Sequence, residues 1–80
     1  MSQAVAQQFK NNLAAYRKHQ GLTQESQSLK LGISRARLSL WESGRELPSW
    51  EMLRILLTQY EASLEDLYPN RSVRDLLCTP

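Results

Sequence analysis

Two short helical segments joined by a glycine turn constrain the fold of this chain more than any other feature. They run from Thr23 to Leu31 and from Arg35 to Ser43, and Gly32-Ile33-Ser34 lies between them. Gly32 has no Cβ atom, so it suits the positive φ of a tight turn. Helices this short are marginal alone, and we therefore expect both to pack against further helices.

One longer helix is expected before this pair. Apolar residues recur there at spacings of four, four and three, at Val5, Phe9, Leu13 and Tyr16. Such spacing places them on one face of a helix. The pattern predicts a helix over Val5–Gln20, with Gly21 as its stop.

Further helices are expected after the pair. The fourth has an apolar stripe and Ser49 near its cap; the stripe consists of Leu53, Leu56, Leu57 and Tyr60. Ser63-Leu64-Glu65-Asp66 has the form of a capping box and opens a short fifth helix, which Pro69-Asn70 ends. A second box at Ser72–Asp75 predicts one or two last turns over Val73–Leu77. No segment alternates as a strand does, so the expected fold class is all-α.

The length of 80 residues predicts one domain, with residues 1–68 as the folded unit and residues 69–80 as a tail. The length leads us to expect no effector domain, and without a basic and apolar leader we expect no signal peptide. We also expect no membrane span, because uncharged apolar runs such as Ile55-Leu56-Leu57 are far too short. One cysteine (Cys78) and one histidine (His19) cannot form an internal disulfide or a structural zinc site. The expectation is therefore a chain without metal or cofactor in a reducing cytoplasm, stabilised by its core or by dimerisation.

The charge is distributed unevenly along the chain. Residues 1–22 carry +3, residues 23–45 carry +2 and residues 46–80 carry −3, which gives the net +2. A basic first half and an acidic second half favour a surface that binds a polyanion. The alternative is a random scatter of surface charge.

Several short motifs stand at fixed places around the helix pair. They are Arg17, Gly21-Leu22-Thr23-Gln24, Gly32-Ile33-Ser34, Trp41-Glu42-Ser43-Gly44 and Pro48. Together they resemble the helix-turn-helix of the lambda-repressor/Cro family, also called XRE-like, from about Leu13 to Tyr68. The resemblance implies a five-helix DNA-binding domain whose recognition helix begins at Arg35 and lies in the major groove. It also implies an ion pair between Arg17 and Glu42.

The start of the recognition helix carries the expected base contacts. Arg35 has the fork that pairs with guanine O6 and N7, and Ala36 offers a small apolar surface to a thymine methyl. Ser34 suits a base or a phosphate, although capping of the helix competes for the same oxygen. Arg37 is expected either to bind phosphate or to face water. For Arg35 the alternative is a solvated surface arginine.

Polar residues around this helix are the expected phosphate contacts. The resemblance implies that Gln24 grips phosphate and braces the recognition helix. Ser39, Ser43 and Arg45 are further candidates, whereas Lys10 and Lys18 are expected to be solvated. Such contacts position a protein on DNA without reading its sequence. We expect no enzymatic activity, because Glu42 has no second carboxylate, base or nucleophile at a matching site.

Three positions depart from the family pattern. Gln27-Ser28 replaces two apolar residues of the second helix, and an apolar residue, Leu29, follows. Either this helix is turned slightly, or Gln27 reaches the surface and Leu29 meets another chain. Leu40 occupies a site that often reads bases, so it is expected at a thymine methyl or at an interface. Glu61 stands where a helix-ending glycine is usual, which puts the following link in doubt.

Two apolar regions have no certain place in the family pattern. We expect Trp50, near the start of the fourth helix, to pack in the core; the alternative is a place on a surface patch. Leu76, Leu77 and Cys78 in the tail are expected to dock on the fifth helix or on a second subunit. Cys78 is interpreted as a bystander rather than a redox switch.

The sequence therefore predicts a DNA-binding transcriptional regulator, in the first instance a repressor. It is expected to act as a homodimer on a palindromic operator, with recognition helices about 34 Å apart. Two alternatives remain: an antitoxin or adaptor whose main task is to bind another protein, and a helical interaction module that no longer binds DNA.

Overall fold

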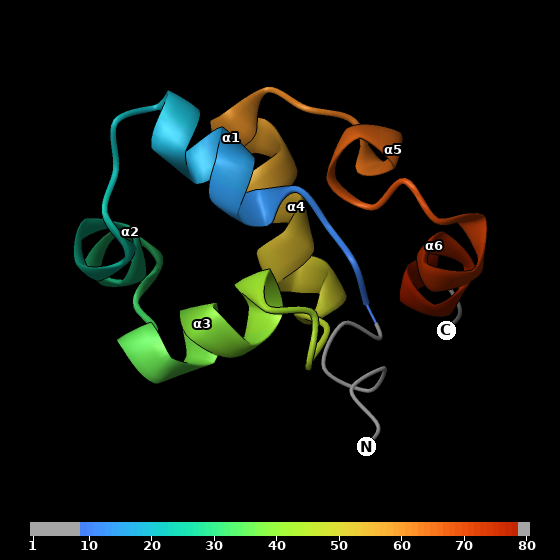
Figure 1. Ribbon diagram of the computed structural model, residues 1–80, viewed down its shortest axis with the longest axis horizontal. Helices are drawn as coiled ribbons and strands as arrows, with labels where there is room; N and C mark the ends of the chain where they lie inside the picture. The colour runs from blue at the N-terminus through green and yellow to red at the C-terminus, as the bar shows by residue number, and fades with distance from the viewer. Residues whose placement is uncertain (1–8, 79–80) are drawn as a thin grey trace, which may run out of the picture.

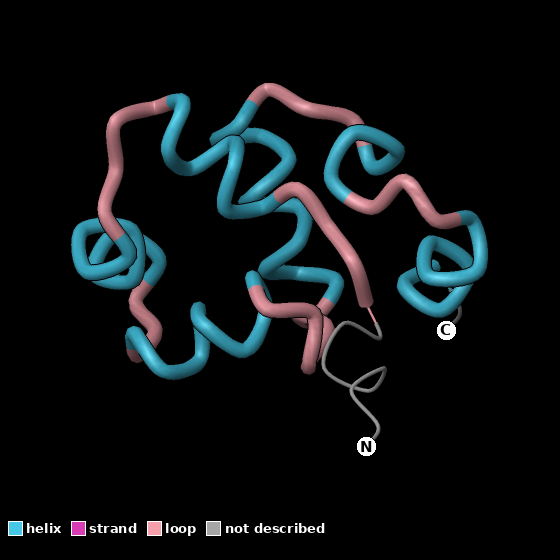
Figure 2. The backbone as a smooth tube through the Cα atoms, viewed as in Figure 1, coloured by secondary structure: helices cyan, strands magenta, loops and turns pink. Residues whose placement is uncertain are grey.

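The computed structural model describes residues 9–78, and every regular element in that range is a helix. Figures 1 and 2 show the arrangement, with loops as the connections between all helices. The helices are α1 (Leu13–His19), α2 (Gln24–Leu31), α3 (Arg35–Glu42), α4 (Trp50–Tyr60), α5 (Leu64–Leu67) and α6 (Arg71–Cys78). The expected all-α fold class is confirmed.

The helices surround one apolar core. In Figure 1, α4 occupies the middle of the view, with α2 and α3 on its left and α5 and α6 on its right. Side chains from α1, α3, α4, α5 and α6, with Tyr68 after α5, form the core cluster: Leu13, Leu38, Trp41, Leu53, Leu56, Tyr60, Leu67, Tyr68, Val73 and Leu77. The core therefore holds α3 directly through Leu38 and Trp41, whereas α2 packs against it through partly buried Leu31.

Four helix starts are where the sequence predicts them. The side chains of Thr23, Ser34, Ser49 and Ser63 each accept a hydrogen bond from the backbone N–H three residues later. Ser63 and Asp66 form the expected capping box. These caps satisfy N–H groups that the first turn of a helix leaves without partners.

The predicted start of the first helix is wrong. Residue 5 lies outside the described residues, and Phe9 precedes α1, which begins only at Leu13. Asn11 explains the late start: its Oδ1 accepts from the Leu13 N–H at 2.9 Å, and its Nδ2 donates to the Trp41 carbonyl at 2.8 Å. A helical Asn11 would lose this link to the end of α3.

The carboxyl-terminal segment is more regular than expected. Instead of one or two turns after a cap at Ser72, α6 has eight residues and begins at Arg71. Asn70 caps it, because its Oδ1 accepts from the backbone N–H of Ser72 and of Val73. Val73 and Leu77 are buried in the core. The described residues therefore contain six helices rather than five.

The burial predicted for Trp50 is also wrong. It is the first residue of α4, and 47% of its surface is exposed. In the tail, Leu77 is buried, whereas Leu76 and Cys78 are exposed. Within residues 9–78, no helix has the length and apolar character needed to cross a membrane.

Candidate nucleic-acid interface

Helix α3 has one buried face and one open face. Leu38 and Trp41, three residues apart, are 1% and 4% exposed, as the sequence predicts. The residues of its first turn, Arg35, Ala36 and Arg37, are exposed. The leading end of α3 therefore points out of the molecule.

The turn before α3 fixes the direction in which the helix leaves α2. Gly32 has φ 75°, and the Ile33 N–H donates to the Ser28 carbonyl at 3.0 Å. Positive φ is a conformation that glycine adopts without steric cost. The Ser34 hydroxyl accepts from the Arg37 N–H at 3.0 Å, so the oxygen considered for DNA contact is used by the cap.

Arg17 and Glu42 join α1 to the end of α3. Arg17 Nε lies 2.7 Å from Glu42 Oε2, and Nη2 lies 3.2 Å from Oε1. The side chains are only 7% and 5% exposed. The hydrogen bond to Glu42 raises the pKa of Arg17, and Nη1 also donates to the Leu22 carbonyl at 2.7 Å. The pair fixes the end of α3 against α1. Removal of either partner would leave an unpaired buried charge, which is costly.

Gln24 connects this ion pair to the exposed end of α3. Its Nε2 donates to Glu42 Oε1 at 3.0 Å, and its Oε1 accepts from Arg35 Nε at 3.4 Å. The amide therefore has one preferred orientation, with the oxygen toward Arg35. This geometry orients the guanidinium while leaving Arg35 exposed.

Arg37 has an intramolecular partner that the sequence did not predict. Its Nη1 forms an ion pair with Oε2 of Glu46, in the loop after α3. The same oxygen accepts from Trp41 Nε1 at 3.3 Å. The loop is thereby attached to α3 at two positions one turn apart.

The remaining candidates follow α3 toward its end. Ser39 and Arg45 are exposed, and Leu40 is half-buried. The Ser43 hydroxyl donates to the Leu40 carbonyl at 3.2 Å, as does the Arg45 N–H at 3.0 Å. Arg45 therefore lies beside the end of α3, on the loop that carries Glu46.

The two alternatives for the polar residues of α2 are now distinguished. Gln27 is fully buried, and its Nε2 donates to the Tyr60 hydroxyl at 2.7 Å. It also exchanges hydrogen bonds with the side chain of Gln59. The Ser28 hydroxyl donates to the Glu25 carbonyl at 2.9 Å. Gln27 thus stays inside with partners, while Leu29 remains 75% exposed.

Two residues that position α3 were missed in the sequence. Asn11 links the start of α1 to Trp41, and Glu46 links the loop to Arg37 and Trp41. An Asn just before a predicted helix is a cap signal, but the Val5–Gln20 stripe concealed it. An acid in a turn gives no comparable signal, because its partner is nine residues away.

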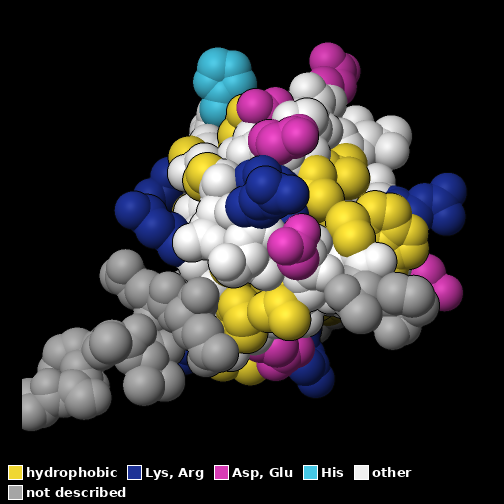
Figure 3. Space-filling view, turned by 90° about the vertical axis from the view of Figure 1, so that its right-hand side faces the viewer, with side chains coloured by type: hydrophobic (Ala, Val, Ile, Leu, Met, Phe, Trp, Pro, Cys, Tyr) yellow, Lys and Arg dark blue, Asp and Glu magenta, His cyan; other side chains and the backbone are white. Residues whose placement is uncertain are grey.

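Exposed basic side chains are present on several elements, including Arg54 on α4 and Arg71 on α6. Exposed cations of α2, its following turn and α3 are Lys30, Arg35 and Arg37. Figure 3 shows the side of α5 and α6, where acidic, basic and apolar side chains are mixed. The leading end of α3 combines an exposed helix start with the exposed side chains of Arg35 and Arg37, which suits a polyanion.

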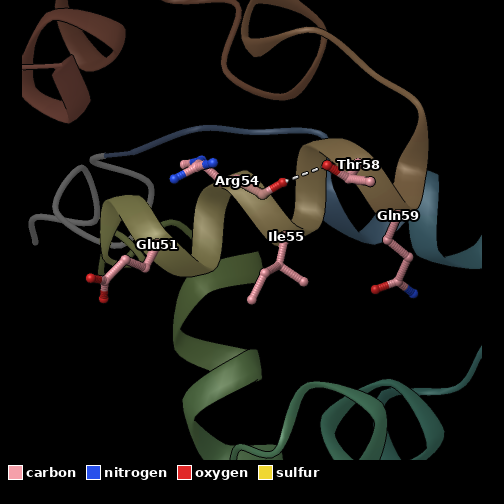
Figure 4. Close-up of a pocket in the computed structure, with 5 residues that line it drawn as sticks. All are labelled: Glu51, Arg54, Ile55, Thr58 and Gln59. Carbon is pink, nitrogen blue, oxygen red and sulfur yellow. Dashed lines mark hydrogen bonds between the residues drawn. The ribbon is translucent and has the colours of Figure 1, made fainter.

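A hollow of about 450 Å³ lies along α4. Its lining consists of Glu51, Arg54, Ile55, Thr58 and Gln59. In Figure 4, Ile55 and Gln59 project from the same side of α4, and Thr58 bonds back to the Arg54 carbonyl. One acid and one base do not form a catalytic set or a basic cluster, so this hollow is a poor candidate for nucleic acid.

The family model that describes a helix-turn-helix matches residues 13–67, from the first residue of α1 to the last of α5. No protein of curated function is significantly similar to the chain, and neither is a solved structure. The matched segment contains the Arg17–Glu42 pair, Gln24 and all of α3.

Proposed function

We propose that this chain, which belongs to the lambda-repressor/Cro-like helix-turn-helix family, represses transcription as a homodimer on a palindromic operator. Family membership makes it a DNA-binding helix-turn-helix regulator. The repressor role, the dimer and the symmetry of the operator are the parts that we propose. Two subunits would place two α3 helices in successive major grooves, about 34 Å apart.

One observation carries the assignment of α3 as the reading helix: its leading end is exposed while Leu38 and Trp41 hold it from behind. Arg35 is then the residue that reads guanine, and Ala36 contacts the neighbouring base edge. Gln24 supports this role, because its hydrogen bonds to Arg35 and Glu42 limit the orientations of the guanidinium. A side chain ordered in advance loses less entropy on binding.

Backbone contacts would surround this reading end. Ser39, Ser43 and Arg45 lie along α3 and the following loop, where phosphates flank a helix in the groove. Such contacts add affinity on every sequence. A single domain of this size makes few of them, which favours a dimer for specific binding.

The test is selection of bound duplexes from a random pool, followed by titration of the selected and of a random duplex. Arg35→Ala is expected to weaken binding to the selected duplex by about 1–3 kcal/mol and binding to the random duplex much less. Arg71→Ala, which removes an exposed cation of α6, serves as the matched control. Sedimentation of the complex gives the number of subunits for each duplex.

Two outcomes would contradict the proposal. Equal losses on both duplexes would make Arg35 a phosphate contact, and the absence of any selected sequence would remove the repressor role. Protein binding as the main task is the second candidate, favoured by Leu29, which is 75% exposed on α2. The selection separates the two, because a protein-binding adaptor has no preferred duplex.

A further inference from the structure

Glu46 lies next to the proposed DNA-binding surface, where an acidic side chain opposes binding to phosphate. Its Oε2 pairs with Arg37 and also accepts from Trp41 Nε1. The pair is partly open to solvent, with the Arg37 side chain 52% exposed and that of Glu46 32% exposed. One of the exposed cations of α3 is therefore neutralised by the protein itself.

We propose that Glu46 limits the DNA affinity of this protein by holding Arg37 away from the phosphate backbone. The inference rests on the proposed function, because it concerns the same surface of α3. It makes Glu46 a residue that sets affinity without touching a base.

The backbone keeps Glu46 in this position. The N–H groups of Arg45 and Glu46 both donate to the Leu40 carbonyl, at 3.0 and 3.3 Å, which folds the loop back on α3. The indole N–H of buried Trp41, one turn along α3, donates to the same carboxylate oxygen. These contacts restrain Glu46 beside Arg37.

The ion pair with Glu46 lowers the contribution that Arg37 can make to DNA binding. To bind a phosphate, Arg37 must first separate from Glu46, so the attraction within the pair is lost from the gain on binding. Half-exposed ion pairs are weak, so this loss is modest, but it applies on every duplex. With Glu46 present, the local charge sums to zero, and Arg37 displaces no counterion from the DNA.

The experiment compares wild type with Glu46→Gln, which removes the charge but keeps an oxygen for the Trp41 N–H. Binding to a selected and to a random duplex of about 25 base pairs, long enough for two half-sites, is measured over a range of salt. Glu46→Gln is expected to bind both duplexes more tightly and to steepen the slope of log K against log salt by about 0.9. Between about 50 and 200 mM salt, the variant then loses about 3.5-fold more affinity than wild type.

The same substitution in an Arg37→Gln background tests whether Glu46 acts through Arg37. There Glu46→Gln is expected to leave the slope unchanged, since no guanidinium is released. A full effect without Arg37 would overturn the inference, because Glu46 would then act only through its own charge. Unchanged or weaker binding by the single variant would overturn it too.

Glu65→Gln is the control for net charge, because it removes an acid from α5, which lies across the molecule from α3 (Figure 1). It is expected to match wild type. Thermal unfolding is measured for each variant to check that the fold is retained. If wild type binds neither duplex, the proposed function itself fails, whereas wild-type binding with no response to Glu46→Gln refutes only this inference.

Discussion

Tyr68 is a fully buried residue whose hydroxyl makes no hydrogen bond to any described residue. Burial also raises its pKa, because the charged form is poorly solvated in the core. A buried polar group without a partner destabilises the folded state by about 1–3 kcal/mol. We therefore expect Tyr68→Phe to raise the free energy of unfolding by about 1–2 kcal/mol, measured by urea titration.

Tyr60→Phe is the matched control at this scale. The Tyr60 hydroxyl accepts from Gln27 at 2.7 Å, so its removal leaves a buried amide with a weaker set of partners. The expected change is a loss of about 1 kcal/mol, opposite in sign to that of Tyr68→Phe. A loss for Tyr68→Phe as well would mean that its hydroxyl is hydrogen-bonded in the folded protein.

The sequence predicted the roles of some residues of the site but not of others. The family resemblance named Arg17, Glu42 and Gln24, and the structure brings these three side chains together. The partner of Arg37 was not predictable, because it depends on how the loop after α3 folds back onto Leu40. The base and phosphate contacts stay predictions.

At the scale of the helices, the end of α4 is the strained element. Glu61 caps α4 with φ 52°, the left-handed conformation that a Cβ atom disfavours. Glycine removes that strain, although it also adds entropy to the unfolded chain. We expect Glu61→Gly to stabilise the protein by about 0.5–1 kcal/mol, seen as a higher midpoint of thermal unfolding.

Glu61→Ala separates conformation from charge in this prediction. Alanine removes the carboxylate but keeps the Cβ atom, so it is expected to give no comparable gain. If alanine and glycine stabilise equally, the charge and not the backbone is the cause.

Helix ends were predictable where one side chain decides them. Ser49 caps its helix from a neighbouring position, so short patterns contain the whole signal. The start of α1 depends on Asn11, whose second partner is Trp41, 30 residues away. The spacing of apolar residues within one segment does not predict such a long-range contact. The prediction for Trp50 was wrong because hydropathy alone does not show which way a side chain points. Trp50 is the first residue of α4, and its side chain is exposed there.

At the scale of the whole molecule, two buried tyrosines couple stability to pH. Burial is the main cause that raises the pKa of Tyr60 from 10.0 to about 12, with a smaller contribution from the charge of Glu42. The pKa of Tyr68 is raised by burial as well. Above pH 10 the unfolded chain therefore releases phenolic protons that the folded chain retains.

The sign of the effect follows from this difference. The unfolded state binds fewer protons there, so the free energy of unfolding falls as pH rises. The contribution is fully present below pH 10 and is lost as pH rises toward 12; for Tyr60 the loss is about 2–3 kcal/mol. Urea titrations between about pH 9 and 11.5 are expected to show the decline, which a Tyr60→Phe/Tyr68→Phe variant should reduce. An equally steep decline in that variant would assign the pH dependence to groups other than these two tyrosines.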